Sequence, residues 1–194
     1  MKLDITIELL SPLQFGSGHE NIIEDSVAVH DEYGLPYFPG KRLKGLLYES
    51  ALEMAAIGNW FTKDEVDQLF GHSSAEADMR IDNFNLRNYN KWCEGWSYLE
   101  SKYPSIFTVE NVGKTFTELR VQTAIDKNTG TTVEGSLHNM RVVDAGLKFY
   151  GSIYLFNEER AERQKEILDY ALKNLRYAGA KRNRGFGHIK CRME

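Results

Sequence analysis

The order of strand-like and helix-like segments constrains the fold of this chain more than any other feature. Residues 2–10 alternate apolar and polar side chains, a period of two that predicts a strand with one buried face. Residues 41–57 and 158–177 instead repeat apolar side chains at the spacing of an amphipathic helix. Three further segments are predicted as strands: residues 78–86, 146–156 and 186–192. The predicted order is therefore strand, helix, strand, strand, helix, strand.

This is the order of the split βαβ, or ferredoxin-like, arrangement, in which four strands form an antiparallel sheet. We therefore predict an α+β fold with a ferredoxin-like (RRM-like) βαββαβ core. Residues 11–40 hold three of the four prolines and four glycines, which predicts a long loop after the first strand. A loop of this length inside a compact domain is more often functional than idle.

A second irregular stretch separates the middle two predicted strands. The aromatic-rich segment at about 88–114 is expected to form a helical insertion, followed by a strand over residues 115–125. A hairpin or extended finger is expected at about 125–139, with its turn at Lys127-Asn128-Thr129-Gly130 and a left-handed glycine. Both insertions would belong to one domain spanning residues 1–194.

Composition excludes several classes of protein. The chain has 194 residues, of which 42% are hydrophobic, enough for one buried core. No stretch approaches the roughly 18 apolar residues of a membrane span, and the N-terminus lacks a signal-peptide pattern. The only cysteines, Cys93 and Cys191, have no metal-binding spacing and are expected to be packing residues. We expect a cytoplasmic protein without a membrane partner.

Charge is distributed unevenly along the chain, although its net value is only −4. Residues 179–192 contain five basic side chains and no acid, and Lys41, Arg42 and Lys44 form a second basic group. Residues 20–32 contain five acids and no Lys or Arg. This segregation predicts basic surfaces for phosphates and an acidic one for a metal, a basic partner or solvent.

The most specific local motif lies between the last predicted helix and the last predicted strand. Its glycines let the backbone approach a phosphate closely, and its cationic side chains supply the charge. The alternative is an ordinary basic loop between a helix and a strand. We predict that RNA backbone binds this loop, through Gly179, Lys181, Arg182, Asn183, Arg184, Gly185, Phe186 and Gly187.

A second candidate RNA-binding surface combines the turn Gly16-Ser17-Gly18 with the basic start of the helix predicted at 41–57. Lys41, Arg42 and Lys44 lie in the first turn of that helix, where cations oppose the helix dipole. An anion bound there would relieve this unfavourable arrangement.

Together these segments resemble proteins of the RAMP superfamily, especially the repeated backbone subunit of type III CRISPR effector complexes. The resemblance covers nearly the whole chain outside about residues 88–114. It is carried, in order, by FGSG, ED and GLPYFPGKRLKGLL near the N-terminus, LFGHSS at Leu69–Ser74, RVQTAIDKNTGTTVEGSL at Arg120–Leu137, GLKFYGSI at Gly146–Ile153, and the terminal GAKRNRGFGHI.

The resemblance implies a ferredoxin-like palm that binds guide RNA, with neighbouring subunits stacked into a filament. The implied partners are guide RNA, target RNA, other RAMP subunits and a large polymerase-like subunit. The segment at 125–139 would be a thumb hairpin that intercalates into the guide–target duplex and flips out a nucleotide. In catalytic members, an aspartate after the first strand cleaves target RNA with a divalent metal, Mg²⁺ or Mn²⁺. Asp25, seven residues after Gly18, has the matching position and would be both the catalytic residue and the metal ligand.

Two alternatives stay open. Catalytic members usually carry two serines where this chain has Lys41-Arg42 and a proline where it has Val27, so the chain is alternatively a structural RAMP subunit that cuts nothing. Glu24, next to Asp25, is also a candidate for the functional acid. The five histidines raise the other alternative, a guide-processing endoribonuclease with histidine as general acid or base: His19, His30, His72, His138 and His188.

Overall fold

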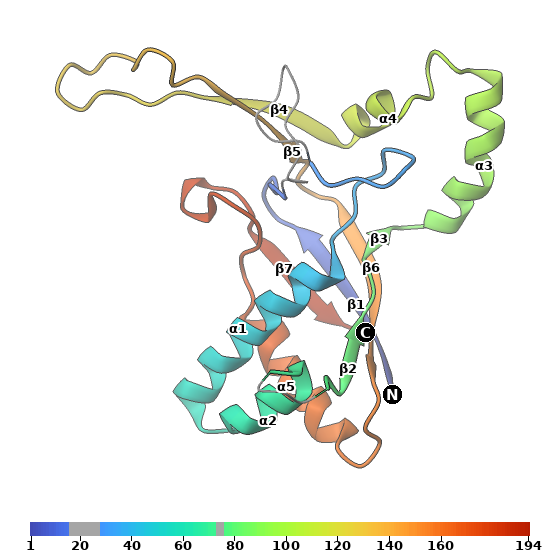
Figure 1. Cartoon of the computed structure of the whole chain (residues 1–194), viewed down its shortest axis with the longest axis vertical. Helices are drawn as coiled ribbons and strands as arrows, with labels where there is room; N and C mark the ends of the chain where they lie inside the picture. The colour runs from blue at the N-terminus through green and yellow to red at the C-terminus, as the bar shows by residue number, and fades with distance from the viewer. Residues whose placement is uncertain (16–27, 73–75) are drawn as a thin grey trace.

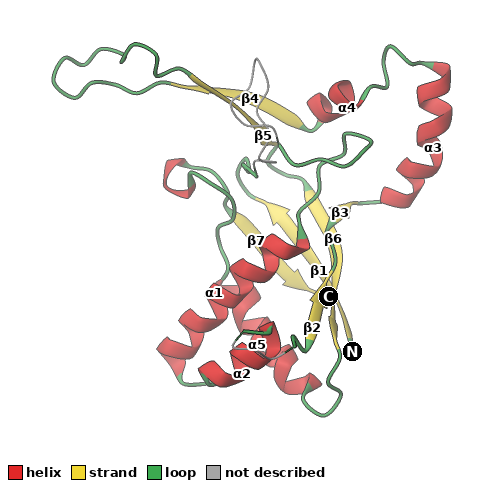
Figure 2. Cartoon of the chain, in the orientation of Figure 1, coloured by secondary structure: helices red, strands yellow, loops and turns green. Residues whose placement is uncertain are grey.

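A five-stranded antiparallel sheet forms the centre of the molecule, as the computed structural model shows for residues 1–15, 28–72 and 76–194 (Figures 1 and 2). The strands follow the order β2-β6-β1-β7, and β3 also pairs with β6. Their bounds are β1 Lys2–Leu9, β2 Met79–Ile81, β3 Asn85–Leu86, β6 Lys148–Leu155 and β7 Ile189–Met193. The prediction of an α+β fold with an antiparallel sheet is confirmed.

The helices α1 (Gly40–Gly58), α2 (Lys63–Phe70) and α5 (Ala161–Asn174) lie on one side of this sheet (Figure 1). The alternation in β1 directs its apolar side chains into the core, as predicted. Burial is nearly complete where sheet and helices meet: Ile5, Ile7 and Leu9 of β1, Leu43, Leu47 and Ala51 of α1, and Ile167, Leu168 and Ala171 of α5 are at most 2% exposed. These contacts form the main hydrophobic core.

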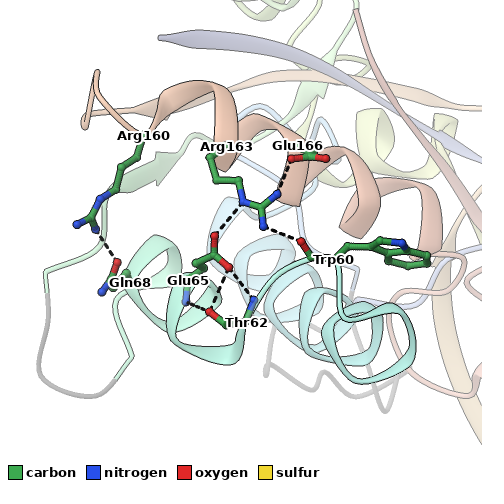
Figure 3. Close-up of polar contacts among 7 residues, drawn as sticks. All are labelled: Trp60, Thr62, Glu65, Gln68, Arg160, Arg163 and Glu166. Carbon is green, nitrogen blue, oxygen red and sulfur yellow. Dashed lines mark hydrogen bonds and ion pairs between the residues drawn. The ribbon is translucent and has the colours of Figure 1, made fainter.

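Polar side chains join α2 to α5 (Figure 3). The Arg163 guanidinium donates to Oε1 of Glu65 at 2.8 Å and to the carbonyl oxygen of Trp60 at 2.6 Å. Thr62 and Glu65 form a capping box, in which the Thr62 N–H donates to Oε2 of Glu65 at 2.7 Å. The Arg163 hydrogen bond, together with that from Thr62, lowers the pKa of Glu65 to about 2. No helix was predicted at residues 63–70, so α2 is an addition to the sequence analysis.

The strand predicted at residues 78–86 is broken into β2 and β3. Between them, Phe84 leaves the ladder and exchanges two backbone hydrogen bonds of 2.9 Å with Phe38. Its ring lies over Gly151, where a Cβ atom would approach the ring to 2.7 Å. The prediction of one continuous strand was wrong because pairing with a distant loop competes with the β6 ladder.

A second, two-stranded sheet consists of β4 (Thr117–Gln122) and β5 (His138–Val143). A bridge between Leu13 and Val143 links it to the chain that follows β1. Helices α3 (Tyr89–Lys102) and α4 (Val109–Thr115) precede it along the chain. We call residues 123–137 the finger; the finger and the β4–β5 ribbon project away from the body (Figure 1). The tip of the finger turns at Asp126–Gly130, and Gly130 has the predicted positive φ, which is +68°.

Two further boundaries differ from prediction. The last helix, expected over residues 158–177, is the shorter α5, because Tyr177 instead pairs with His188 across the base of the following loop. The last strand begins at Ile189 rather than at residue 186, because Phe186 turns away toward β5. Within the described residues, no helix is long and apolar enough to cross a membrane.

Candidate nucleic-acid interface

The loop from Gly179 to Gly187, here called the glycine loop, is fixed at both ends by close backbone contacts. Gly179 has φ +76°, and a Cβ there would lie 2.4 Å from the carbonyl oxygen of Gln14. Gly187 has φ +75°, and a Cβ there would lie 1.9 Å from the carbonyl oxygen of Ala178. A side chain at either position is incompatible with this packing. The glycines therefore set the path of the loop and leave its middle, Lys181 to Gly185, on the surface.

The cationic middle of the loop is a single turn of 3₁₀ helix, Arg182–Arg184, between two left-handed residues. One of these is Lys181, with φ +56°, a conformation that costs a non-glycine residue about 1 kcal/mol. Its Nζ reaches across to β4 and donates to Oε1 of Gln122 at 2.9 Å. Arg182 and Arg184 are exposed. The loop thus presents three cations, and Lys181 also contacts the ribbon that carries the finger.

Phe186 is the one predicted RNA-binding residue of this loop whose side chain is buried. It is 8% exposed and packs with Met140 and Val142 in a small cluster of its own. Its ring therefore anchors the loop to β5 and is not presented for base stacking.

A groove of about 850 Å³, here called the finger groove, separates the glycine loop from the base of the finger. Lys181 and Arg184 line one side of it, and Gln122 and His138 line the other. None of the described residues that line the groove is an aspartate or glutamate. The charged side chains that line the groove, Lys181 and Arg184, are therefore both cationic, as a phosphate-binding surface requires.

A second groove of about 390 Å³, the helix groove, joins the two basic segments that the sequence analysis predicted separately. Arg42 of α1 and Gly179 of the glycine loop both line it, together with Phe15 and Glu49. The Arg42 guanidinium lies over the Phe15 ring, with Cζ 5.1 Å from the centroid. Gln14 lines both grooves and marks their junction. Lys41 is exposed, and Lys44 is half-buried, on the same first turns of α1.

Several predicted residues lie outside the described part of the chain. Gly16, Ser17, Gly18 and Asp25 belong to residues 16–27. Just outside that segment, the N–H of Val29 donates to the carbonyl oxygen of Phe15 at 3.0 Å. Phe15 before the segment and Val29 after it are thus neighbours, and Phe15 contacts Arg42. Among described residues, no group of three or more His, Cys, Asp or Glu side chains is arranged to hold a metal ion.

The histidines within the described residues lie on separate elements. His72 stacks on Tyr48 after α2, with ring centroids 3.9 Å apart, and His188 stacks on Tyr177 at 5.1 Å. His138 begins β5 and faces the finger groove, whereas His30 contacts the carbonyl oxygen of Asp31. The sequence analysis missed Gln14, Gln122 and Asn139 in the finger groove, because a single amide side chain carries no recognisable motif.

A family model identifies the family of this chain. The model described as the RAMP superfamily matches residues 6–190, almost the entire chain. This chain belongs to the RAMP superfamily. The resemblance noted from the sequence motifs is thereby confirmed.

Relatives of this RAMP protein agree with that assignment. The CRISPR system Cms endoribonuclease Csm3 of Methanocaldococcus jannaschii is 26% identical over an alignment that covers 98% of this chain and 77% of the relative. Two cryo-EM structures of type III-B Cmr-beta share the fold. The complex bound to cognate target RNA contains a chain with a TM-score of 0.75 and 14% identity, and the apo state one with 0.73 and 16%. Both matches cover 100% of this RAMP protein and 97% of the other chain.

Proposed function

We propose that this RAMP protein is a guide-RNA-binding backbone subunit of a type III CRISPR-like interference complex. The observation that carries the proposal is the finger groove, which Lys181 and Arg184 of the glycine loop line together with the base of the finger. A sequence-independent RNA binder needs cations and backbone groups directed at phosphates, and base-specific contacts are not required. The relative named Csm3 and the fold shared with Cmr-beta chains support this assignment.

The central sheet is consistent with the ferredoxin-like palm of this proposal. Its principal strands and helices follow the order β1-α1-β2-β6-α5-β7 along the chain. In the sheet, β1 pairs with both β6 and β7. The finger would then act as the thumb hairpin, and its apolar side chains support that role: Ile125 is 64%, Val133 46% and Leu137 59% exposed. The partners would be guide RNA, target RNA, further RAMP subunits in a filament and a large polymerase-like subunit, all in the cytoplasm.

Substitution of the three cations of the glycine loop tests RNA binding. We expect Lys181→Ala, Arg182→Ala and Arg184→Ala together to lower the affinity for single-stranded RNA at least about tenfold, because the lost contacts are to phosphates. Unrelated RNA sequences should lose affinity equally. A matched control replaces Lys2, Lys114 and Lys173, which form surface ion pairs away from the groove, and removes the same charge. Equal losses in the two triple variants would contradict the proposal.

Cleavage of target RNA through Asp25 is the second part of the proposal. Its support is the sequence spacing from Gly18 and the position of Phe15, which precedes residues 16–27, contacts Arg42 and accepts a hydrogen bond from Val29. If Asp25 holds the divalent metal, Asp25→Ala abolishes target cleavage in the assembled complex and leaves RNA binding intact. Glu24→Ala, which changes the neighbouring acid, should retain cleavage. Full cleavage by Asp25→Ala would contradict the assignment, and no cleavage by the wild type would favour the structural alternative.

A further inference from the structure

Gln14, at the junction of the finger groove and the helix groove, has a buried carboxamide oxygen that no protein group satisfies. Its side chain is only 8% exposed, and among the described residues its Oε1 has no hydrogen-bond partner. A buried oxygen without a donor destabilises the folded protein, so native structures rarely retain one without a reason. Since Gln14 lines both grooves, a ligand in either is a candidate donor.

The backbone of Gln14 is held from two sides, so the point from which its side chain extends has a fixed position. Its carbonyl oxygen accepts from the N–H of Ala180 in the glycine loop at 3.1 Å. The preceding residue, Leu13, exchanges backbone hydrogen bonds of 2.9 and 2.8 Å with Val143 of β5. The backbone of Gln14 is therefore fixed relative to both the glycine loop and the base of the finger. A nucleotide whose phosphate contacts Lys181 or Arg184 would lie in the groove that Gln14 also lines.

The chemistry of RNA limits which of its groups can donate a hydrogen bond to Gln14 on every nucleotide. A phosphate diester has no donor, and the N–H groups of the bases differ from one nucleotide to the next. The ribose 2'-hydroxyl occurs on every nucleotide, and it both donates and accepts. It can pair with either end of the carboxamide, whose oxygen and nitrogen exchange places on rotation about the Cγ–Cδ bond.

We propose that the Gln14 carboxamide binds a ribose 2'-hydroxyl of RNA in the finger groove, and that this contact makes the site prefer RNA to DNA. The inference rests on the proposed function, because it needs a nucleic-acid backbone beside Lys181 and Arg184. It assigns to Gln14 a discrimination between RNA and DNA that neither the basic residues nor the glycines provide.

The affinities of three ligands of one mixed sequence test this proposal: single-stranded RNA, the same strand with 2'-fluoro riboses, and DNA. The 2'-fluoro strand keeps the sugar pucker of RNA but has no hydroxyl. Gln14→Met keeps the size of the side chain and removes its hydrogen-bonding groups. We expect this variant to bind RNA roughly fivefold more weakly and the other two ligands unchanged, the loss expected for one neutral hydrogen bond.

Gln122→Met is the matched control, since Gln122 lines the same groove but its Oε1 already accepts from Lys181. It should leave the ratio of RNA to 2'-fluoro affinity as in the wild type. The wild type itself should prefer RNA to the 2'-fluoro strand, a comparison that does not depend on whether any variant folds. Equal affinity of the wild type for these two strands overturns the inference.

The two proposals fail differently. If binding depends on Lys181 and Arg184 but Gln14→Met leaves the ratio of affinities unchanged, only the role of Gln14 is wrong. If RNA binding is indifferent to Lys181 and Arg184, the proposed function is wrong and the role of Gln14 is overturned with it.

Discussion

The hydrophobic core of the helical body and the finger differ in how deeply their apolar side chains are buried. In the body, Leu43 and Leu168 are completely buried, and Glu65 accepts hydrogen bonds from both Arg163 and Thr62. On the finger, Ile125 is 64% exposed and Leu137 is 59% exposed. The core side chains of the body thus stabilise the fold, and the exposed apolar side chains of the finger contribute little to it. Substitutions should therefore affect stability and RNA binding separately.

The largest expected difference is in the free energy of unfolding, between a substitution in the core and one on the finger. Phe84→Ala removes a completely buried ring that lies over Gly151, and we expect the free energy of unfolding to fall by about 3–5 kcal/mol. Ile125→Ala on the finger should change it by less than about 0.5 kcal/mol, because the side chain is already exposed. Denaturant titrations of the two variants measure both values. Similar losses in the two variants would contradict the division between body and finger.

Two glycines of the glycine loop allow a comparison between a closely packed position and an open one within one segment. Gly187→Ala places a Cβ 1.9 Å from the carbonyl oxygen of Ala178, in addition to the left-handed backbone strain, so we expect a loss of at least about 2 kcal/mol. Gly185 has a similar φ, +82°, but nothing lies within 4 Å of an added Cβ. Gly185→Ala should therefore cost only the backbone strain, about 1 kcal/mol. Thermal unfolding of both variants distinguishes the two, and equal melting temperatures would show that close packing at Gly187 is unimportant.

A smaller effect, dependent on pH, is expected where α2 meets α5. Hydrogen bonds from Arg163 and, second, from Thr62 lower the pKa of Glu65 from an ordinary 4.5 to about 2. The stabilisation by these contacts is therefore present above pH 4.5 and is lost as the pH falls toward 2. Because both side chains are partly exposed, Arg163→Ala should cost only about 1 kcal/mol at pH 7. The difference from wild type should shrink between pH 4.5 and 2.

The control for this prediction is Lys173→Ala, which breaks an exposed pair with Asp169 on the same helix. It should cost no more than about 0.5 kcal/mol at pH 7. A difference between Arg163→Ala and wild type that stays constant down to pH 2 would mean that Glu65 does not contribute to the acid dependence.

Local patterns in the sequence predicted the elements that depend on local physics. The alternation at residues 2–10 predicted β1, and the turn tetrapeptide predicted the left-handed Gly130. The capping box of Thr62 and Glu65 was also a local signal, and it would have identified α2.

Contacts between distant segments could not be predicted in this way. The strand break at Phe84 depends on its pairing with Phe38, and the burial of Phe186 depends on Met140 and Val142. For the site, composition identified the basic glycine loop, but only the fold brings it to the finger and to Gln14.

The most direct test of the central claim is the salt dependence of RNA binding by the wild type and by the triple alanine variant at Lys181, Arg182 and Arg184. If these side chains contact phosphates, the slope of log affinity against log salt concentration should become shallower by about 2, from about 0.7 for each of three contacts on a single strand. The control variant at Lys2, Lys114 and Lys173 should keep the slope of the wild type. A slope that is unchanged in the glycine-loop variant would show that RNA does not bind along the finger groove.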